Sequence, residues 1–306
     1  MTANRVVSFL PSATELLYEL NASDILYGVT HECTYPEEAK TKPRVIRSVI
    51  DSDRMSSKEI DQKVNELASS GEDIYQLDEE NIKKASPDLI ISQLICEVCS
   101  AHTNQVNKAL KIVKSKPKVY SYTPHDVDGI LETINDVAEL VNRKEEGKKL
   151  QTRLQEKIEK TSSQKHDSRP SVLALEWLEP FYSAGHWVPQ MINISGGKNA
   201  IGKTGDHSFR ISYEKVLTSN PDIIILMPCG FDTDRTKIEY ENTLKNDEKW
   251  AKLRAVRKGN VFAVDANSYF SKPSIRTITG IEILNKIIHP EKFEESLPSD
   301  SYLQLR

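Results

Sequence analysis

Two short segments of the chain combine cysteine and histidine at spacings that are typical of metal centres. Cys96 and Cys99 form a C-x-x-C pair with His102 three residues later. His31 and Cys33 form a second pair on another predicted loop. Two or three thiolates with one imidazole suffice for tetrahedral zinc or for a cluster, while a C-x-x-C pair after a strand also suits redox chemistry. Metal binding, redox chemistry and simple packing all remain open for these thiols.

His186 is the histidine that we expect to contribute to function. It lies between Gly185 and Trp187, just before a helix predicted from residue 188. A loop imidazole in this setting can coordinate cobalt or iron, or donate a hydrogen bond to a polar ligand. Capping of the following helix is the alternative. The histidines beside predicted helix ends or linkers, for which no role is expected, are His125, His166 and His289.

One segment matches a nucleotide-binding pattern. Residues 197–204 have the order G-x-x-x-x-G-K-T, as in a P-loop. A working P-loop needs a buried strand before it and a helix after it, so that backbone N–H groups face the phosphates. Residues 188–194 instead predict a helix, and residues 205–208 predict a turn. We therefore do not expect nucleotide binding here.

The composition excludes several classes of ligand and location. The chain has 306 residues, with 41 Lys and Arg against 45 Asp and Glu and a net charge of −4. No overall positive field exists to hold nucleic acid. The longest apolar run, residues 223–227, is far shorter than the ~18 residues that a membrane helix needs, so direct membrane insertion is not expected.

The first predicted elements indicate an α/β fold. Residues 5–10 predict a strand that stops at Pro11, and Ser12 with Glu15 resembles a capping box that opens a helix. The strands predicted to follow, which alternate with helices, are residues 25–30, 88–92 and 118–122. Such alternation indicates a parallel sheet covered on both faces.

The order of elements divides the chain into three parts. Residues 1–123 form an α/β lobe, residues 124–165 a linking helix, and residues 166–306 a second α/β lobe. The apolar spacing from 124 to about 161 predicts one long helix, unless Gly147 divides it. The motif S-P-D-L-I-I-S at 86–92 is echoed by N-P-D-I-I-I-L at 220–226, as expected for two similar lobes.

These features together resemble the class III substrate-binding proteins of ABC importers for cobalamin, haem and ferric siderophores. The resemblance rests on residues 11–15, the paired Pro-Asp strand entries, the linking helix and residues 259–265. It implies two parallel-sheet α/β lobes joined by a single long helix, the class III periplasmic-binding-protein fold. The motifs that resemble the subgroup of cobalamin-binding proteins lie at residues 30–33, 96–99, 176–177, 185–189, 228–232 and 269–270.

The resemblance implies a ligand between the two lobes, in loops at the carboxyl ends of the strands. Aromatic side chains in these loops suit a large, flat ligand such as a corrin, although packing between the lobes is the alternative. The residues expected to contact the ligand are Ser12, Thr14, Trp177, Tyr182, His186, Trp187, Phe231, Tyr269 and Phe270. The residues of the possible metal site are His31, Cys33, Cys96 and Cys99.

Two acidic residues match the family's permease contacts. In the family, one carboxylate on each lobe docks on arginines of the permease, and Glu80 and Glu214 each lie seven residues before a Pro-Asp entry. Both also lie early in predicted helices, where the helix dipole favours a carboxylate in any case. Residues 1–17 show neither an export signal nor a lipid-anchoring cysteine, so we expect a cytoplasmic location and no ABC permease as partner.

Three hypotheses for function follow. The first is a cytosolic, non-catalytic carrier, buffer or sensor of cobalamin or a related tetrapyrrole-like corrinoid. The second is a protein that binds zinc, iron or a cluster through its Cys and His residues, an enzyme being one form of it. The third is the substrate-binding subunit of an ABC importer.

Overall fold

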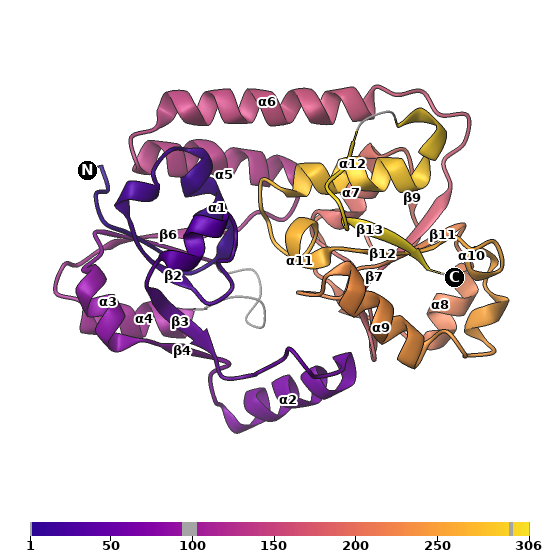
Figure 1. The fold of residues 1–306 in the computed structure, drawn as a ribbon, viewed down its shortest axis with the longest axis horizontal. Helices are drawn as coiled ribbons and strands as arrows, with labels where there is room; N and C mark the ends of the chain where they lie inside the picture. The colour runs from indigo at the N-terminus through magenta and orange to yellow at the C-terminus, as the bar shows by residue number, and fades with distance from the viewer. Residues whose placement is uncertain (1, 94–102, 294–295, 306) are drawn as a thin grey trace. The chain divides into compact units, whose positions relative to one another are not determined.

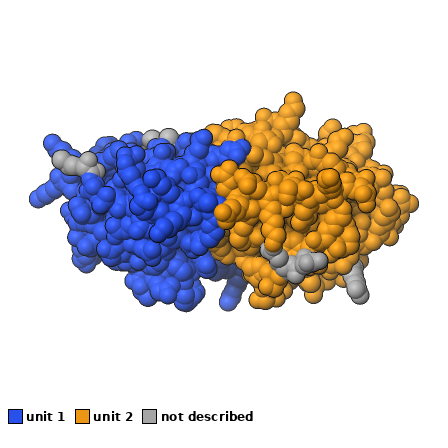
Figure 2. Space-filling view, turned by 90° about the horizontal axis from the view of Figure 1, so that it is seen from above, with its two compact units in different colours: residues 1–54, 62–124, 128–154 blue, residues 55–61, 125–127, 155–306 orange. Residues whose placement is uncertain are grey.

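The computed structural model describes residues 2–93, 103–293 and 296–305 (Figure 1). The chain divides into two compact units, which Figure 2 shows in blue and orange. Unit 1 comprises Met1–Arg54, Gln62–Pro124 and Asp128–Leu154, and unit 2 comprises Met55–Asp61, His125–Val127 and Gln155–Arg306. None of the helices in the described ranges has the length and apolar character that crossing a membrane would require.

Unit 1 is built around a mixed six-stranded sheet in the part of the chain that is described. Its strands, in order across the sheet, are β4 (Tyr75–Leu77), β3 (Arg44–Ser48), β2 (Leu26–Thr30), β1 (Val6–Ser8), β5 (Leu89–Gln93) and β6 (Lys118–Tyr122). All neighbouring pairs are parallel except β3 with β4. The central strands β1 and β5 are buried along their whole length and mostly apolar, as expected when helices cover both faces of a parallel sheet.

Helices complete unit 1. They are α1 (Pro11–Glu19), most of α2 (Ser57–Ser70), α3 (Glu79–Ala85), α4 (Thr103–Ile112), α5 (Val127–Leu140) and the first half of α6 (Lys144–Ser162), with short 3₁₀ turns at Ser23–Ile25 and Glu37–Thr41. The prediction that Ser12 caps α1 is wrong. Leu10 is the N-cap and Pro11 is the first helical residue, which places Ser12 inside the first turn and buries it.

The segment predicted as one long helix contains two, α5 and α6. Asn142 between them has a φ of 57°, and the N–H of Arg143 donates to the carbonyl of Ala138 over 2.7 Å. This is the Schellman arrangement, in which a left-handed residue ends a helix. Helical spacing of apolar residues continues on both sides of Asn142, which is why the sequence pattern did not reveal the break.

Gly147, where the sequence suggested a division, lies inside α6. A Cβ at this position would lie 2.5 Å from the Cβ of Ala138, so glycine allows α6 to pack closely against α5. The chain passes from unit 1 to unit 2 within α6, after Leu154. The predicted linking segment, residues 124–165, thus contains both helices.

Unit 2 is also built around a mixed sheet within the described residues. Its strands, in order, are β10 (Phe209–Arg210), β8 (Phe181–Ser183), β7 (Ser171–Leu178), β11 (Ile223–Leu226), β12 (Val261–Val264) and β13 (Tyr302–Leu305), with β9 (Lys198–Asn199) paired to β7. Strands β7, β11 and β12 are parallel, whereas β8, β10 and β13 run antiparallel to their neighbours. Two α/β units with parallel central strands confirm the predicted fold class, and the antiparallel edges are the difference.

The helices of unit 2 pack around a core in which Trp250 is fully buried. They are α7 (Val188–Ile194), α8 (Tyr213–Ser219), α9 (Thr233–Thr243), α10 (Arg254–Arg257), α11 (Ala266–Tyr269) and α12 (Thr277–Ile288), with 3₁₀ turns at Trp250–Lys252 and Pro290–Lys292. The P-loop pattern at 197–204 is followed by turns, and the next helix begins only at Tyr213. The segment therefore lacks the helix that a phosphate site needs.

A glycine at the end of α7 provides a test of packing in unit 2. Gly196 has a φ of 82°, and a Cβ there would lie 2.6 Å from the ring of His166 and 2.7 Å from that of His289. We expect Gly196→Ala to lower the free energy of unfolding by about 2–4 kcal/mol, because steric overlap adds to backbone strain. Gly259→Ala is the control, since its φ is 69° but its Cβ would meet open space; it is expected to cost about 1 kcal/mol. Equal losses in chemical denaturation would contradict this account.

Candidate functional site

The loop that carries His186 is fixed by backbone contacts with a second loop. His186 adopts a left-handed φ of 52°, its N–H donates to the carbonyl of Asp206 over 2.6 Å, and its carbonyl accepts from the N–H of Gly205 over 2.9 Å. A Cβ on Gly185 would lie 2.4 Å from the nitrogen of Ser208. Glycine is therefore required at 185, because the two loops touch backbone to backbone.

This pairing brings together three imidazoles from separate segments of unit 2. The ring centroid of His186 lies 5.0 Å from that of His207 and 6.0 Å from that of His125, and the latter two are 5.8 Å apart. His207 and His125 were not predicted as site residues. No local pattern identifies them, because His207 is brought near by the pairing of residue 186 with residues 205–206, and His125 comes from a segment distant in sequence.

The surroundings of His186 keep its imidazole neutral. Burial, followed by repulsion from His207 and His125, lowers the pKa of His186 to about 4. Its Nδ1 is buried and has no hydrogen-bond partner among the described residues. A neutral imidazole keeps one unprotonated nitrogen, which can accept a hydrogen bond or coordinate a metal.

Trp177 and Phe231 form an aromatic face on the same unit. Their rings meet edge to face with centroids 5.6 Å apart. The guanidinium carbon of Arg235 lies 3.7 Å from the centroid of Phe231, a cation–π contact. Trp177 is half-buried on β7, and its indole N–H donates to the carbonyl of Ser57 over 3.1 Å. Tyr182, also half-buried, pairs with Trp177 across β7 and β8.

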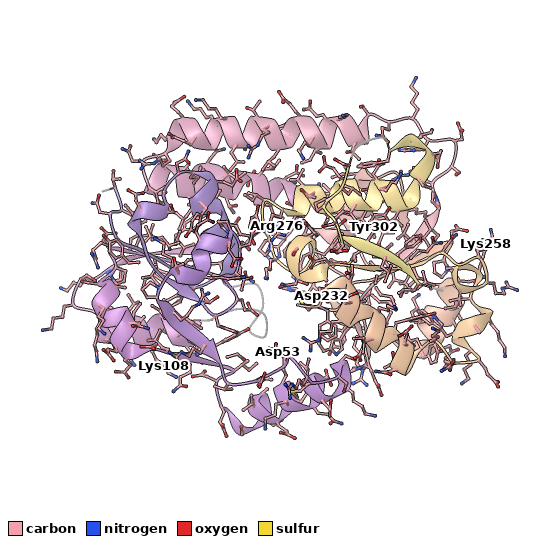
Figure 3. All side chains as sticks on the ribbon, in the orientation of Figure 1. Asp53, Lys108, Asp232, Lys258, Arg276 and Tyr302 are labelled. Carbon is pink, nitrogen blue, oxygen red and sulfur yellow. The ribbon has the colours of Figure 1, made fainter. Side chains whose placement is uncertain are left out.

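Trp187, Tyr269 and Phe270 form a more deeply buried group. Their exposed fractions are 4%, 9% and 3%, and the indole N–H of Trp187 donates to the carbonyl of Phe270 over 2.8 Å. The guanidinium carbon of Arg276 lies 4.8 Å from the ring centroid of Tyr269. Figure 3 labels Arg276, and it also labels Asp232, the residue that precedes α9. Trp187 thus ties α7 to the segment after α11. A ligand contact by these residues stays a prediction.

In unit 1, Ser12 and Thr14 lie in the first turns of α1. Both are buried, and the Thr14 hydroxyl donates to the sulfur of Cys33 over 3.1 Å. The hydroxyl of Thr30 lies 3.3 Å from the same sulfur. Cys33 is fully buried, so its thiol packs among hydroxyl groups in this conformation. The Ser12 hydroxyl is buried and has no hydrogen-bond partner among the described residues.

The predicted metal site stays a prediction. Cys96 and Cys99, with the neighbouring His102, lie outside the described residues. The ring of His31 lies 6.0 Å from that of Tyr75. Within the described ranges, no group of three His, Cys, Asp or Glu residues is arranged to hold a metal.

The two acidic residues matched to permease contacts lie on helix starts. Glu80 is in the first turn of α3, is largely exposed and forms an ion pair with Lys84. Glu214 is exposed in the first turn of α8, which Ser212 caps. Both positions are open to a partner and also suit the helix dipole. Their role in docking stays a prediction.

Comparisons with known proteins agree on one family. The sequence model of the periplasmic binding protein family matches residues 6–268. The uncharacterized ABC transporter substrate-binding lipoprotein YvrC of Bacillus subtilis is 25% identical over 297 residues, which are 95% of this chain and 82% of that protein.

Solved structures show the same fold. A periplasmic heme binding protein from Pseudomonas aeruginosa is similar with a TM-score of 0.73 and 16% identity, covering 97% of this chain and 96% of that one. The periplasmic vitamin B12 binding protein BtuF of Vibrio cholerae is similar with a TM-score of 0.68 and 20% identity, covering 95% and 99%.

Two expectations from the sequence are wrong. A cytoplasmic location is contradicted because the similar proteins are a lipoprotein and periplasmic binding proteins. The absence of an ABC permease partner is contradicted because YvrC is a substrate-binding protein of an ABC transporter. Both expectations rested on the first residues of the chain, whereas the comparisons extend over nearly all of it.

The buried position of Trp187 allows a test of whether this side chain stabilises the fold. We expect Trp187→Phe to lower the free energy of unfolding by about 1–3 kcal/mol, because the Phe270 carbonyl loses its donor and a gap opens beside α7. Trp177→Phe is the control, since the indole that it replaces is only half-buried, and a loss below about 1 kcal/mol is expected. A Trp187→Phe protein as stable as wild type in urea denaturation would show that this contact does not hold α7.

Proposed function

We propose that this chain, which belongs to the periplasmic binding protein family, is the substrate-binding subunit of an ABC importer and carries a tetrapyrrole-like metal complex. The family match over residues 6–268 and the likeness to YvrC support the transport role. The proteins of similar structure include one that binds haem and one that binds vitamin B12. Both ligands are tetrapyrrole-like metal complexes, which supports this ligand class for the present chain.

The observation that carries the ligand proposal is the state of His186. Its imidazole is neutral at ordinary pH because its pKa is lowered to about 4, and its buried Nδ1 has no partner among the described residues. Iron or cobalt in a planar macrocycle has axial positions that a neutral imidazole can occupy. The fixed backbone of the loop holds the ring in place, so little ordering is needed on binding.

Aromatic side chains of the same unit supply the apolar contacts that such a ligand needs. Trp177 and Tyr182 are half-buried on the paired strands β7 and β8, and the buried ring of Phe231 packs edge to face against Trp177. Burying an aromatic surface against a macrocycle contributes about 1.5–3 kcal/mol for each side chain. We assign ligand contact first to Trp177, Tyr182 and His186 for this reason.

The permease contacts are assigned to Glu80 and Glu214. Each carboxylate is exposed, one lies in unit 1 and the other in unit 2, and each lies in the first turn of a helix. An exposed carboxylate at a helix start can pair with an arginine of a partner without losing a buried contact of its own. The ion pair between Glu80 and Lys84 is exposed and easily exchanged.

A spectroscopic titration tests the ligand proposal. The purified chain, titrated separately with hemin and with aquocobalamin, is expected to shift the visible bands of at least one of them at micromolar concentration. His186→Asn is the informative variant, because asparagine tolerates a positive φ while removing the imidazole. We expect this variant to lose the band shift and to bind about tenfold or more weakly.

His207→Asn is the matched control, since it removes a neighbouring imidazole that is exposed. It is expected to keep the band shift. A shift that survives His186→Asn would assign the metal contact to another residue, and the absence of binding to either compound would refute the proposed ligand class.

A further inference from the structure

Residues Met55–Asp61 belong to unit 2, although the chain on both sides of them belongs to unit 1. The segment contains the start of α2. Ser56 and Glu59 form a capping box there, in which the Ser56 N–H donates to the Glu59 carboxylate over 2.8 Å and the Ser56 hydroxyl accepts from the N–H of Glu59 over 3.3 Å. The first turn of α2 is thus stabilised by its own residues.

The segment is docked by polar contacts that come from β7 and α9. The N–H and the hydroxyl of Ser57 both donate to the carboxylate of Glu239, the former over 3.0 Å. Arg235 donates to the carbonyl of Met55 over 3.1 Å. Ser57 is fully buried and Glu239 is 6% exposed. The carboxylate of Glu239, which comes from α9 and contacts the start of α2, is therefore shielded from water. Hydrogen bonds to a shielded carboxylate are among the stronger ones.

The same contacts use the aromatic face that we assign to the ligand. The indole N–H of Trp177 donates to the carbonyl of Ser57, and Arg235, which reaches Met55, also stacks over Phe231. An exposed ion pair of 3.1 Å between Lys58 and Glu179 adds a further contact beside β7. The docked segment therefore occupies groups that a ligand at Trp177 and Phe231 would use.

We propose that Met55–Asp61 is a latch that occupies the Trp177–Phe231 face and leaves it as a unit when that face takes up ligand. Glu239 holds the latch, and the capping box keeps its helical turn intact after release. Release of this segment on ligand binding rests on the proposed function. Its retention by Glu239 does not.

Hydrogen exchange, read by mass spectrometry on the full chain, tests the hold without any ligand. Glu239→Gln removes the charge of the acceptor, and we expect the amides of residues 55–61 to exchange about tenfold faster. Glu241→Gln is the matched control, because Glu241 lies on the same helix and pairs with Lys245 at the surface. In this variant, exchange of the amides at 55–61 should equal that in the wild-type protein. Trp177→Phe removes the indole donor and should also speed exchange there.

Two outcomes would contradict the proposal that Glu239 holds residues 55–61 in place. Exchange at 55–61 that is unchanged in both Glu239→Gln and Trp177→Phe would show that these contacts do not restrain the segment. Faster exchange throughout unit 2 in both variants would show a general loss of stability in place of a latch.

Adding hemin or aquocobalamin to the wild-type protein tests release. Faster exchange at 55–61 in the bound state supports the latch, while unchanged or slower exchange with ligand bound refutes its release. If neither compound binds, the proposed ligand class fails, and the comparison of Glu239→Gln with Glu241→Gln still decides whether Glu239 holds the segment.

Discussion

The candidate site depends on one backbone contact, the pairing of His186 with residues 205–206. Because both loops meet through main-chain atoms, residue 185 must be glycine and residue 186 must adopt a left-handed conformation. The imidazole lies beside His207 and His125, and burial, followed by repulsion from these two rings, keeps it neutral. A neutral ring keeps one unprotonated nitrogen, which is what the proposed metal contact requires, although the sequence nearby contains no recognisable metal motif.

The fold serves this site through its rigid strands. β7 and β8 carry Trp177 and Tyr182, and the loop after β8 carries His186. The positions of Trp177 and Tyr182 therefore follow from sheet register, whereas that of His186 follows from the pairing of its loop with residues 205–206. A carrier that binds one flat molecule benefits from such a fixed surface, because fewer side chains must be ordered on binding. The latch at Met55–Asp61 covers part of that surface with hydrogen bonds that a ligand would have to replace.

Much of the fold follows from the sequence, for reasons that differ between elements. Continuous apolar runs give β5 and β11, since strands buried on both faces need no alternation. The resemblance to class III binding proteins of ABC importers is likewise confirmed by the comparisons. The two residues of β10 could not be predicted, because they are exposed and extended only through pairing with β8. The helix break at Asn142 was missed because a single left-handed residue leaves the apolar spacing unchanged.

The site itself was only partly predictable. Sequence context indicated His186, but the neighbours that set its charge state come from segments 21 and 61 residues away and have no local signature. Aromatic residue type cannot separate Trp187, whose indole is buried, from Trp177, whose indole is half-buried. Location and partner were predicted wrongly, since no physical property of the folded units decides them.

The charge state of His186 is the central claim, and nuclear magnetic resonance of the imidazole nitrogens measures it directly. Burial and the neighbouring imidazoles disfavour the charged form, so the signals of His186 in the ligand-free chain should stay those of a neutral ring as the pH falls through 6.5 and should change only near pH 4. A midpoint at 6.5 or above would contradict the account, because His186 would then carry a proton, and not a free lone pair, over much of the range in which a ligand must bind.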